Sequence, residues 1–237
     1  SLYRQVEAES GPGFTRGTHT AWRHKNYVFI ADEVYRASQV KGAKDESADR
    51  MYGTLQVIDV SDIEAPKSVA WYTPENGGRG FIRGTHTAWR HGQYVFVADE
   101  VFGLEAAKAL PQGRPSRAYG RLHVVDVSDI AHPKEVAWYE PEYGGVHNVW
   151  VAGDTLYMGA YDGGFRVFDV SGELKGDLRA QGREIAFVST ADMQGKIQNQ
   201  AMTWGVVVNP ADGLAYVNDF YNGLWIVRVE PRSPPVP

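Results

Sequence analysis

Short segments of alternating apolar and polar residues follow one another along the chain, and turn residues separate them. This period of two predicts half-buried β-strands. In the first part of the chain it predicts four of them, over residues 18–23, 27–32, 55–60 and 67–72. The tight turn His24-Lys25-Asn26 separates the first two strands, so they are expected to form an antiparallel hairpin.

The whole pattern returns 67 residues later. Residues 16–24 (RGTHTAWRH) recur unchanged as residues 83–91, and residues 57–62 (VIDVSD) recur as residues 124–129 (VVDVSD). A fixed period indicates a repeat architecture, and four short antiparallel strands per repeat are typical of one blade of a β-propeller. Two looser copies follow. The sequence therefore predicts a single all-β propeller domain over residues 1–237, with blades at approximately 17–82, 83–144, 145–200 and 201–230 plus 1–15.

The fourth unit contains only three predicted strands, and its missing strand is expected at the other end of the chain. Residues 14–17 align with residues 81–84 at the same offset, which places about residues 2–7 where a fourth strand belongs. We therefore predict a four-bladed propeller whose last blade is closed by the N-terminal strand, which removes an exposed sheet edge. Part of a larger propeller, or an eight-bladed ring shared by two chains, is the alternative.

The third predicted strand of each unit carries a recurring motif. Residues 55–62 (LQVIDVSD) and 122–129 (LHVVDVSD) resemble the signature of LVIVD-repeat proteins. Residues 165–171 (FRVFDVS) are a looser copy, and residues 224–229 (LWIVRV) are degenerate, with Arg228 in place of the aspartate. The resemblance touches all four units and implies a propeller from a bacterial or archaeal protein, often at the cell surface. It implies no single activity.

Composition narrows the classes of partner. The net charge of −5 is mild and the charges are mixed along the chain, so no nucleic-acid partner is expected. No apolar run approaches the roughly 20 residues of a membrane-spanning helix, so membrane insertion is not expected. The lack of cysteine excludes disulfides, thiolate ligands and thiol nucleophiles within the chain. We expect a periplasmic or extracellular protein, although the composition leaves the cytoplasm open.

Three histidines at equivalent positions, His19, His86 and His147, are the main candidates for chemistry. Each stands at the entry of the first strand of its blade, and this strand lines the central channel of a propeller. Three converging imidazoles suit a divalent transition metal such as zinc, copper, iron or nickel, so we predict these residues as metal ligands. A ring of structural hydrogen bonds to the adjacent blades and metal-free acid/base catalysis are the two alternatives.

Other residues are expected at the same mouth of the channel. Acidic pairs at the exit of the second strand are predicted to transfer protons or to orient the imidazoles: Asp32, Glu33, Asp99 and Glu100. A second set is predicted to bind substrate: Arg16, Arg83, Tyr35, Phe102, Tyr161 and Asp219. Ion pairs with the glutamates are the alternative for the two arginines. His123 and His132 are expected at the surface.

Together these features predict a metal-dependent enzyme acting on a small-molecule substrate, as a monomer or a homodimer. The sequence does not choose among hydrolysis, elimination, isomerisation and oxidation. The alternative is a non-catalytic propeller that binds a protein or a glycan, or that serves as a subunit of a larger assembly, because one fold hosts many functions.

Overall fold

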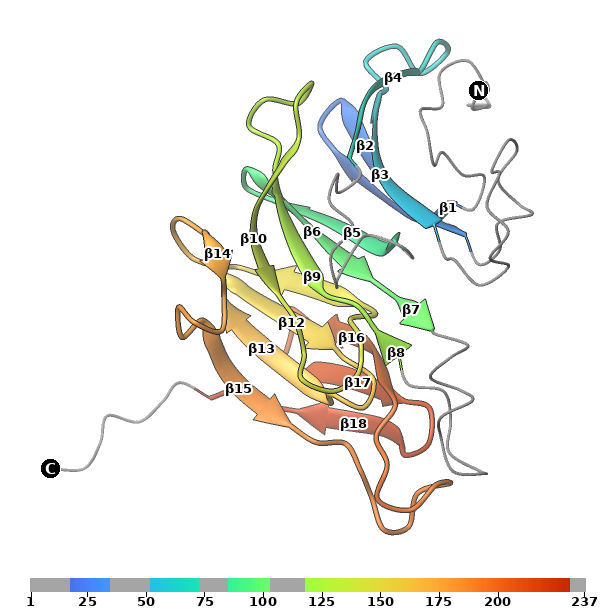
Figure 1. Cartoon of the computed structure of the whole chain (residues 1–237), viewed down its shortest axis with the longest axis vertical. Coiled ribbons are helices and arrows are strands. Elements are labelled where there is room, and N and C mark those ends of the chain that lie inside the picture. The colour runs from blue at the N-terminus through green and yellow to red at the C-terminus, as the bar shows by residue number, and fades with distance from the viewer. Residues whose placement is uncertain (1–17, 35–51, 73–84, 103–117, 231–237) are drawn as a thin grey trace, which may run out of the picture.

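The computed structural model describes residues 18–34, 52–72, 85–102 and 118–230, and the account below concerns these residues. None of them lies in a helix, which confirms the all-β prediction. Four small sheets follow one another as the blades of a four-bladed β-propeller (Figure 1). In this part of the chain there is accordingly no apolar helix long enough to cross a membrane.

Blades 1 and 2 follow the same plan. Blade 1 consists of β1 (Thr18–His24), β2 (Tyr27–Val34), β3 (Tyr52–Asp59) and β4 (Lys67–Tyr72), each antiparallel to the next. Blade 2 consists of β5 (Thr85–His91), β6 (Tyr94–Asp99), β9 (Leu122–Asp126) and β10 (Lys134–Tyr139). A separate ribbon of β7 (Val101–Phe102) and β8 (Ala118–Tyr119) leads into and out of residues 103–117.

Blades 3 and 4 have diverged from this plan. Blade 3 contains β11 (Val149–Ala152), β12 (Thr155–Gly159), β13 (Phe165–Asp169) and β15 (Glu184–Val188). A short strand that the sequence did not predict, β14 (Gly176–Asp177), pairs in parallel with β10 and extends blade 2. Blade 4 contains β16 (Thr203–Val208), β17 (Ala215–Asp219) and β18 (Gly223–Val227). The strand expected at residues 2–7 lies outside the described residues.

The core consists of three apolar layers, one at each joint between consecutive blades. Two residues of each third strand, which we call the third-strand pair, fill the centre of a layer. They are Leu55 and Val57 in blade 1, Leu122 and Val124 in blade 2, and Phe165 and Val167 in blade 3, and all are buried. Burying an aliphatic or aromatic side chain contributes roughly 1.5–3 kcal/mol, so the repeated motif stabilises each joint.

Candidate metal site

The innermost strands bring the three equivalent histidines together in a stack. The imidazole centroids of His19 and His86 lie 3.8 Å apart, and those of His86 and His147 lie 3.7 Å apart. The planes of the two pairs are tilted by 38° and 40°. Strand β5 packs against β1 and against β11, so neighbouring blades place the equivalent side chains side by side.

Each histidine is hydrogen-bonded to the backbone of the next blade. Nδ1 of His19 lies 3.0 Å from the carbonyl oxygen of His86, Nδ1 of His86 lies 3.2 Å from that of His147, and Nδ1 of His147 lies 3.0 Å from that of Trp204. A carbonyl oxygen only accepts hydrogen bonds, so each Nδ1 carries the proton. The lone pair of each neutral ring is therefore on Nε2.

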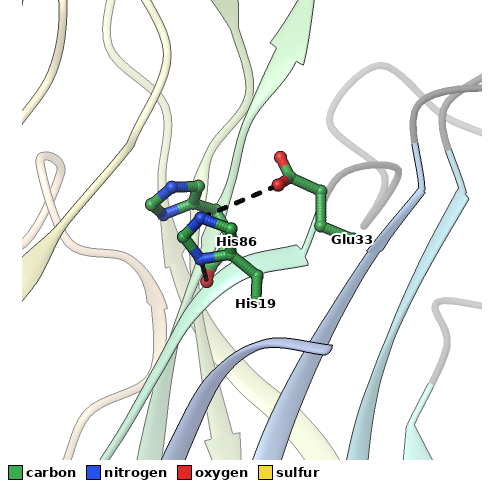
Figure 2. Close-up of side chains that lie close together, drawn as sticks. All are labelled: His19, Glu33 and His86. Atoms are coloured by element: carbon green, nitrogen blue, oxygen red, sulfur yellow. Dashed lines mark hydrogen bonds and ion pairs between the residues drawn. The ribbon is translucent and has the colours of Figure 1, made fainter. Parts of the chain in front are cut away.

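Two glutamates lie beside these Nε2 atoms. A carboxylate oxygen of Glu33 is 4.0 Å from Nε2 of His19, and Oε2 of Glu100 is 3.7 Å from Nε2 of His86 and 4.0 Å from Nε2 of His147. Figure 2 shows the Glu33 carboxylate directed toward the stacked rings of His19 and His86. Two groups of potential ligands result, each with its ligand atoms within 4.8 Å of one another: His19, Glu33 and His86, and His86, Glu100 and His147.

Burial keeps the inner imidazoles neutral. Removal from water lowers the pKa of His86 to about 2, and the neighbouring imidazoles His147 and His19 lower it as well. Burial also lowers the pKa of His147, against the opposing effect of the Glu100 carboxylate. A neutral imidazole is the form that binds a metal, so protons do not compete for these two Nε2 atoms near neutral pH.

The two groups differ in their surroundings. In the group around Glu100, the side chains of His86, Glu100 and His147 are 3%, 5% and 12% exposed, whereas in the other group the side chain of His19 is 41% exposed. The buried hydroxyl of Tyr161 donates a hydrogen bond to Oε1 of Glu100, which leaves Oε2 toward the imidazoles. The Glu100 group is therefore the better enclosed and the more completely oriented of the two.

Tyr161 occupies in blade 3 the position that Glu33 and Glu100 occupy in blades 1 and 2. Its backbone has a φ of 50°, which is rare for a residue with a bulky side chain. Its ring contacts His147 edge-on at 5.2 Å. In blade 3 an aromatic side chain therefore takes the place of the repeated glutamate, and the substrate-binding role expected of Tyr161 stays a prediction.

Asp32 and Asp99 lie inside their own blades, away from the stacked imidazoles. The Asp32 carboxylate accepts hydrogen bonds from Thr18, at 3.0 Å, and from Gln56. Burial raises the pKa of Asp32 to about 7, although the Thr18 hydroxyl opposes this shift. The Asp99 carboxylate lies 3.7 Å from Nε2 of His123. The structure thus brings the two glutamates, but not the two aspartates, to the imidazole stack.

His123 was predicted at the surface, and this prediction is wrong. The residue is 1% exposed, and its Nδ1 lies 3.1 Å from Glu135, which also accepts a hydrogen bond from Tyr72 of blade 1. Burial opposes protonation of His123, but the carboxylates of Asp99 and Glu135 outweigh it and raise the pKa of the imidazole. The signal in the sequence was the recurrence of a polar residue at this position of the motif, Gln56 in blade 1 and His123 in blade 2. The structure buries Gln56 beside Asp32 as well.

The remaining predicted residues have other positions. Asp219 accepts hydrogen bonds from Thr190 and from the backbone N–H groups of Met202 and Tyr221, which organises the loops of blade 4. Arg16, Tyr35 and Arg83 lie outside the described residues, as does the side chain of Phe102. His132 is exposed, as predicted.

Comparison with known families agrees with this architecture. The family model of the LVIVD repeat matches residues 118–140 and 143–173. The chain contains LVIVD repeats. This finding confirms the resemblance for the third-strand motifs of blades 2 and 3. The first matched segment includes β8, β9 and β10, and the second includes β11, β12 and β13. No curated protein matches the chain.

Proposed function

We propose that this LVIVD-repeat propeller binds one divalent transition metal through Nε2 of His86, Nε2 of His147 and the carboxylate of Glu100, and that it is a metal-dependent enzyme acting on a small molecule. The observation that carries the proposal is the convergence of these three ligand atoms within 4.8 Å at the joint of blades 2 and 3. A second observation supports it, because each ligand is held from its far side by a hydrogen bond. Such outer contacts fix the tautomer and orientation of metal ligands.

The donor set limits the metal. Two neutral imidazoles and one carboxylate suit zinc, iron, copper or nickel, and three protein ligands leave coordination positions for water and substrate. A metal in such a site polarises a bound carbonyl group or lowers the pKa of bound water. The exposed side chain of His19 marks the open side of the stack, so substrate is proposed to approach there, next to Glu33.

One chain is proposed to hold one metal. Nδ1 of His86 donates to a carbonyl oxygen, so His86 has only Nε2 to offer, although it belongs to both groups of potential ligands. The two groups therefore compete for the same donor atom. The enclosed Glu100 group is the preferred one, and Glu33 is then available as an acid/base group rather than as a ligand.

The hydrogen bonds of the stack also favour a second candidate function. They tie each blade to the next without any metal, as expected of structural histidines in a propeller that serves as a binding module for a protein or a glycan. In that case no metal copurifies with the protein, and replacing a histidine reduces stability without reducing metal content.

Elemental analysis of tag-free protein, followed by titration of the metal-free protein with Co²⁺, distinguishes the two candidates. We expect about one metal per chain, loss of this metal in Glu100→Gln, and retention in the matched variant Glu33→Gln, which makes the same change in the neighbouring group. If neither native nor reconstituted protein holds a metal, the metal proposal fails. Equal loss in both variants would show that the assignment to the Glu100 group is wrong.

A further inference from the structure

The third-strand pair of blade 4 is uncovered. Leu224 and Ile226 of β18 occupy the positions of Phe165 and Val167 of β13, because β18 pairs with β17 as β13 pairs with β12. Phe165 and Val167 are buried beneath blade 4, whereas Leu224 and Ile226 are each 59% exposed. Val207 of β16 is exposed as well. The described residues thus leave an apolar layer at the end of blade 4 without the neighbour that covers it elsewhere.

Each blade also has a face opposite to its third-strand pair, which we call its reverse face. In blade 1 the reverse face has no neighbouring blade among the described residues. Ala88, Val95 and Val97 on the reverse face of blade 2 are fully buried, because blade 1 packs on them. Their equivalents in blade 1, 67 residues earlier, are Ala21, which is exposed, and Val28 and Ile30, which are partly exposed. Blade 1 therefore presents the surface that a preceding blade covers at every other joint.

The two uncovered faces are of the two kinds that pack on each other at every joint. Each of the three joints packs the third-strand pair of one blade onto the reverse face of the next. Blade 4 offers the first kind of face and blade 1 offers the second. Figure 1 shows blade 1 at the top of the molecule and blade 4 in its lower half, with blades 2 and 3 between them.

The turn from blade to blade indicates which molecule supplies the missing neighbour. The planes of equivalent imidazoles differ by 38° and 40° at successive joints, and the planes of equivalent indoles differ by 27° and 46°. A ring of eight blades needs about 45° at each joint, whereas blade 4 would reach blade 1 of its own chain only with about 90°. All of the observed angles between equivalent ring planes are closer to 45° than to 90°, which favours a ring of eight blades.

We propose that a second copy of this chain covers both faces, so that the four blades of each copy do not close on themselves but pack head to tail with those of the other copy into a ring of eight blades. The two new joints are identical, and each places the third-strand pair of blade 4 from one copy on the reverse face of blade 1 of the other. Head-to-tail packing forms a discrete particle only when the rotation closes, and two copies suffice here.

The test is the mass of the particle in solution, measured by native mass spectrometry and by light scattering over a range of protein concentrations. Leu224→Glu places a charge on one proposed face and Ala21→Glu places one on the other. Met193→Glu is the matched control, because Met193 is 62% exposed in the loop between β15 and β16 and belongs to neither face. We expect dimers for the unchanged chain and for Met193→Glu, and monomers for the other two variants.

Mixing the two monomeric variants adds a sharper criterion. Leu224→Glu retains an intact blade 1 face and Ala21→Glu retains an intact blade 4 face, so the mixture should form a weak heterodimer through one unchanged joint. A monomeric unchanged chain, a larger assembly, or dissociation by Leu224→Glu alone would each overturn the proposal. The last result would mean that two blade 4 faces pack on each other. Circular dichroism and cooperative urea unfolding establish that the variants are folded.

Discussion

At the scale of single residues, the imidazole stack shows how backbone hydrogen bonds prepare a side chain for chemistry. The carbonyl oxygen of the next blade fixes the proton of His86 on Nδ1, and burial prevents a second proton from binding Nε2. In most histidines the tautomer and the charge both fluctuate near neutral pH. In His86 both are fixed by the joint between blades, so its Nε2 is an available lone pair.

The contact of Tyr161 with Glu100 should be important for metal affinity. Tyr161→Phe removes the hydrogen bond that orients the carboxylate, and loss of such an outer contact typically costs about 10–100-fold in affinity. We expect a decrease of that size in competition titrations with a zinc chelator. The control is Tyr157→Phe, which removes a hydroxyl group from the opposite face of blade 3. An unchanged affinity in Tyr161→Phe would contradict an orienting role for the hydroxyl.

Stability should depend on pH through His123. Its pKa is raised in the folded protein above the ordinary value of 6.5, so the protonated imidazole stabilises the folded state fully below pH 6.5. This stabilisation is lost as the pH rises through the folded-state pKa. We expect the free energy of unfolding in urea to fall between pH 6 and pH 9 more steeply than in His123→Gln, the substitution that blade 1 already carries as Gln56. Equal slopes would show that His123 does not gain its proton on folding.

His123 also shows where sequence reasoning fails at this scale. Alternation within residues 122–126 suggested that a polar residue between two apolar ones faces water. In a propeller the third strand of a blade is covered on both faces by neighbouring blades, so a polar residue there is buried and needs hydrogen-bond partners. The repeat did predict which residues are equivalent. It could not predict that Glu33 and Glu100 turn toward the imidazoles while Asp32 and Asp99 turn away, because that depends on local backbone geometry.

At the scale of elements, the joints combine apolar packing with a repeated polar contact. The hydroxyl of Thr20 donates to the carbonyl oxygen of His86 at 2.7 Å, and the hydroxyl of Thr87 donates to that of His147 at 2.9 Å. Each carbonyl oxygen thus receives both an imidazole and a hydroxyl from the preceding blade. These contacts fix how far the first strand of one blade is shifted along the first strand of the next, which the apolar layers alone do not specify.

Removal of one such hydroxyl should reduce stability by a modest amount. Thr87→Val keeps the shape of the side chain and leaves the carbonyl oxygen of His147 with its imidazole donor, so we expect a loss of about 1 kcal/mol in the free energy of unfolding. Thr20→Val makes the same change at the more exposed joint and should cost less. Urea denaturation of both variants measures the two losses. A larger loss in Thr20→Val would contradict the dependence on burial.

The four strands of blade 1 could be predicted to within three residues at each end, because the 67-residue repeat displays each pattern twice. The short strand β14 could not. It pairs with β10 through only two residues of a loop, Gly176 and Asp177, while Leu174 and Leu178 beside it enter the core of the joint. Such pairing is decided by the position of a neighbouring blade rather than by local periodicity.

At the scale of the whole molecule, metal binding and stability should be coupled, because the proposed ligands come from consecutive blades. His86 and Glu100 belong to blade 2 and His147 to blade 3, so a bound metal holds the joint closed only in the folded state. A ligand at 100 times its dissociation constant adds about 2.7 kcal/mol to the free energy of unfolding.

Zinc should therefore raise the midpoint of thermal unfolding by about 5–10 °C for a chain of this size. Scanning calorimetry with and without Zn²⁺ measures the shift, and chelation should reverse it. Glu100→Gln should show little or no shift, whereas Glu33→Gln should respond like the unchanged chain. A shift of the same size in Glu100→Gln would mean that zinc stabilises the protein at some other place.

The position of the ligands at a joint has a consequence for how such a protein grows by duplication. A single blade carries at most one histidine and at most one glutamate of the stack, so it cannot form a complete group alone. An inserted copy of the unit from β5 to β10 would bring one new glutamate and one new histidine, and it would create one additional group with the blade that follows it. The number of binding groups would then be set by the number of joints that carry the glutamate, and in blade 3 Tyr161 stands at the glutamate position.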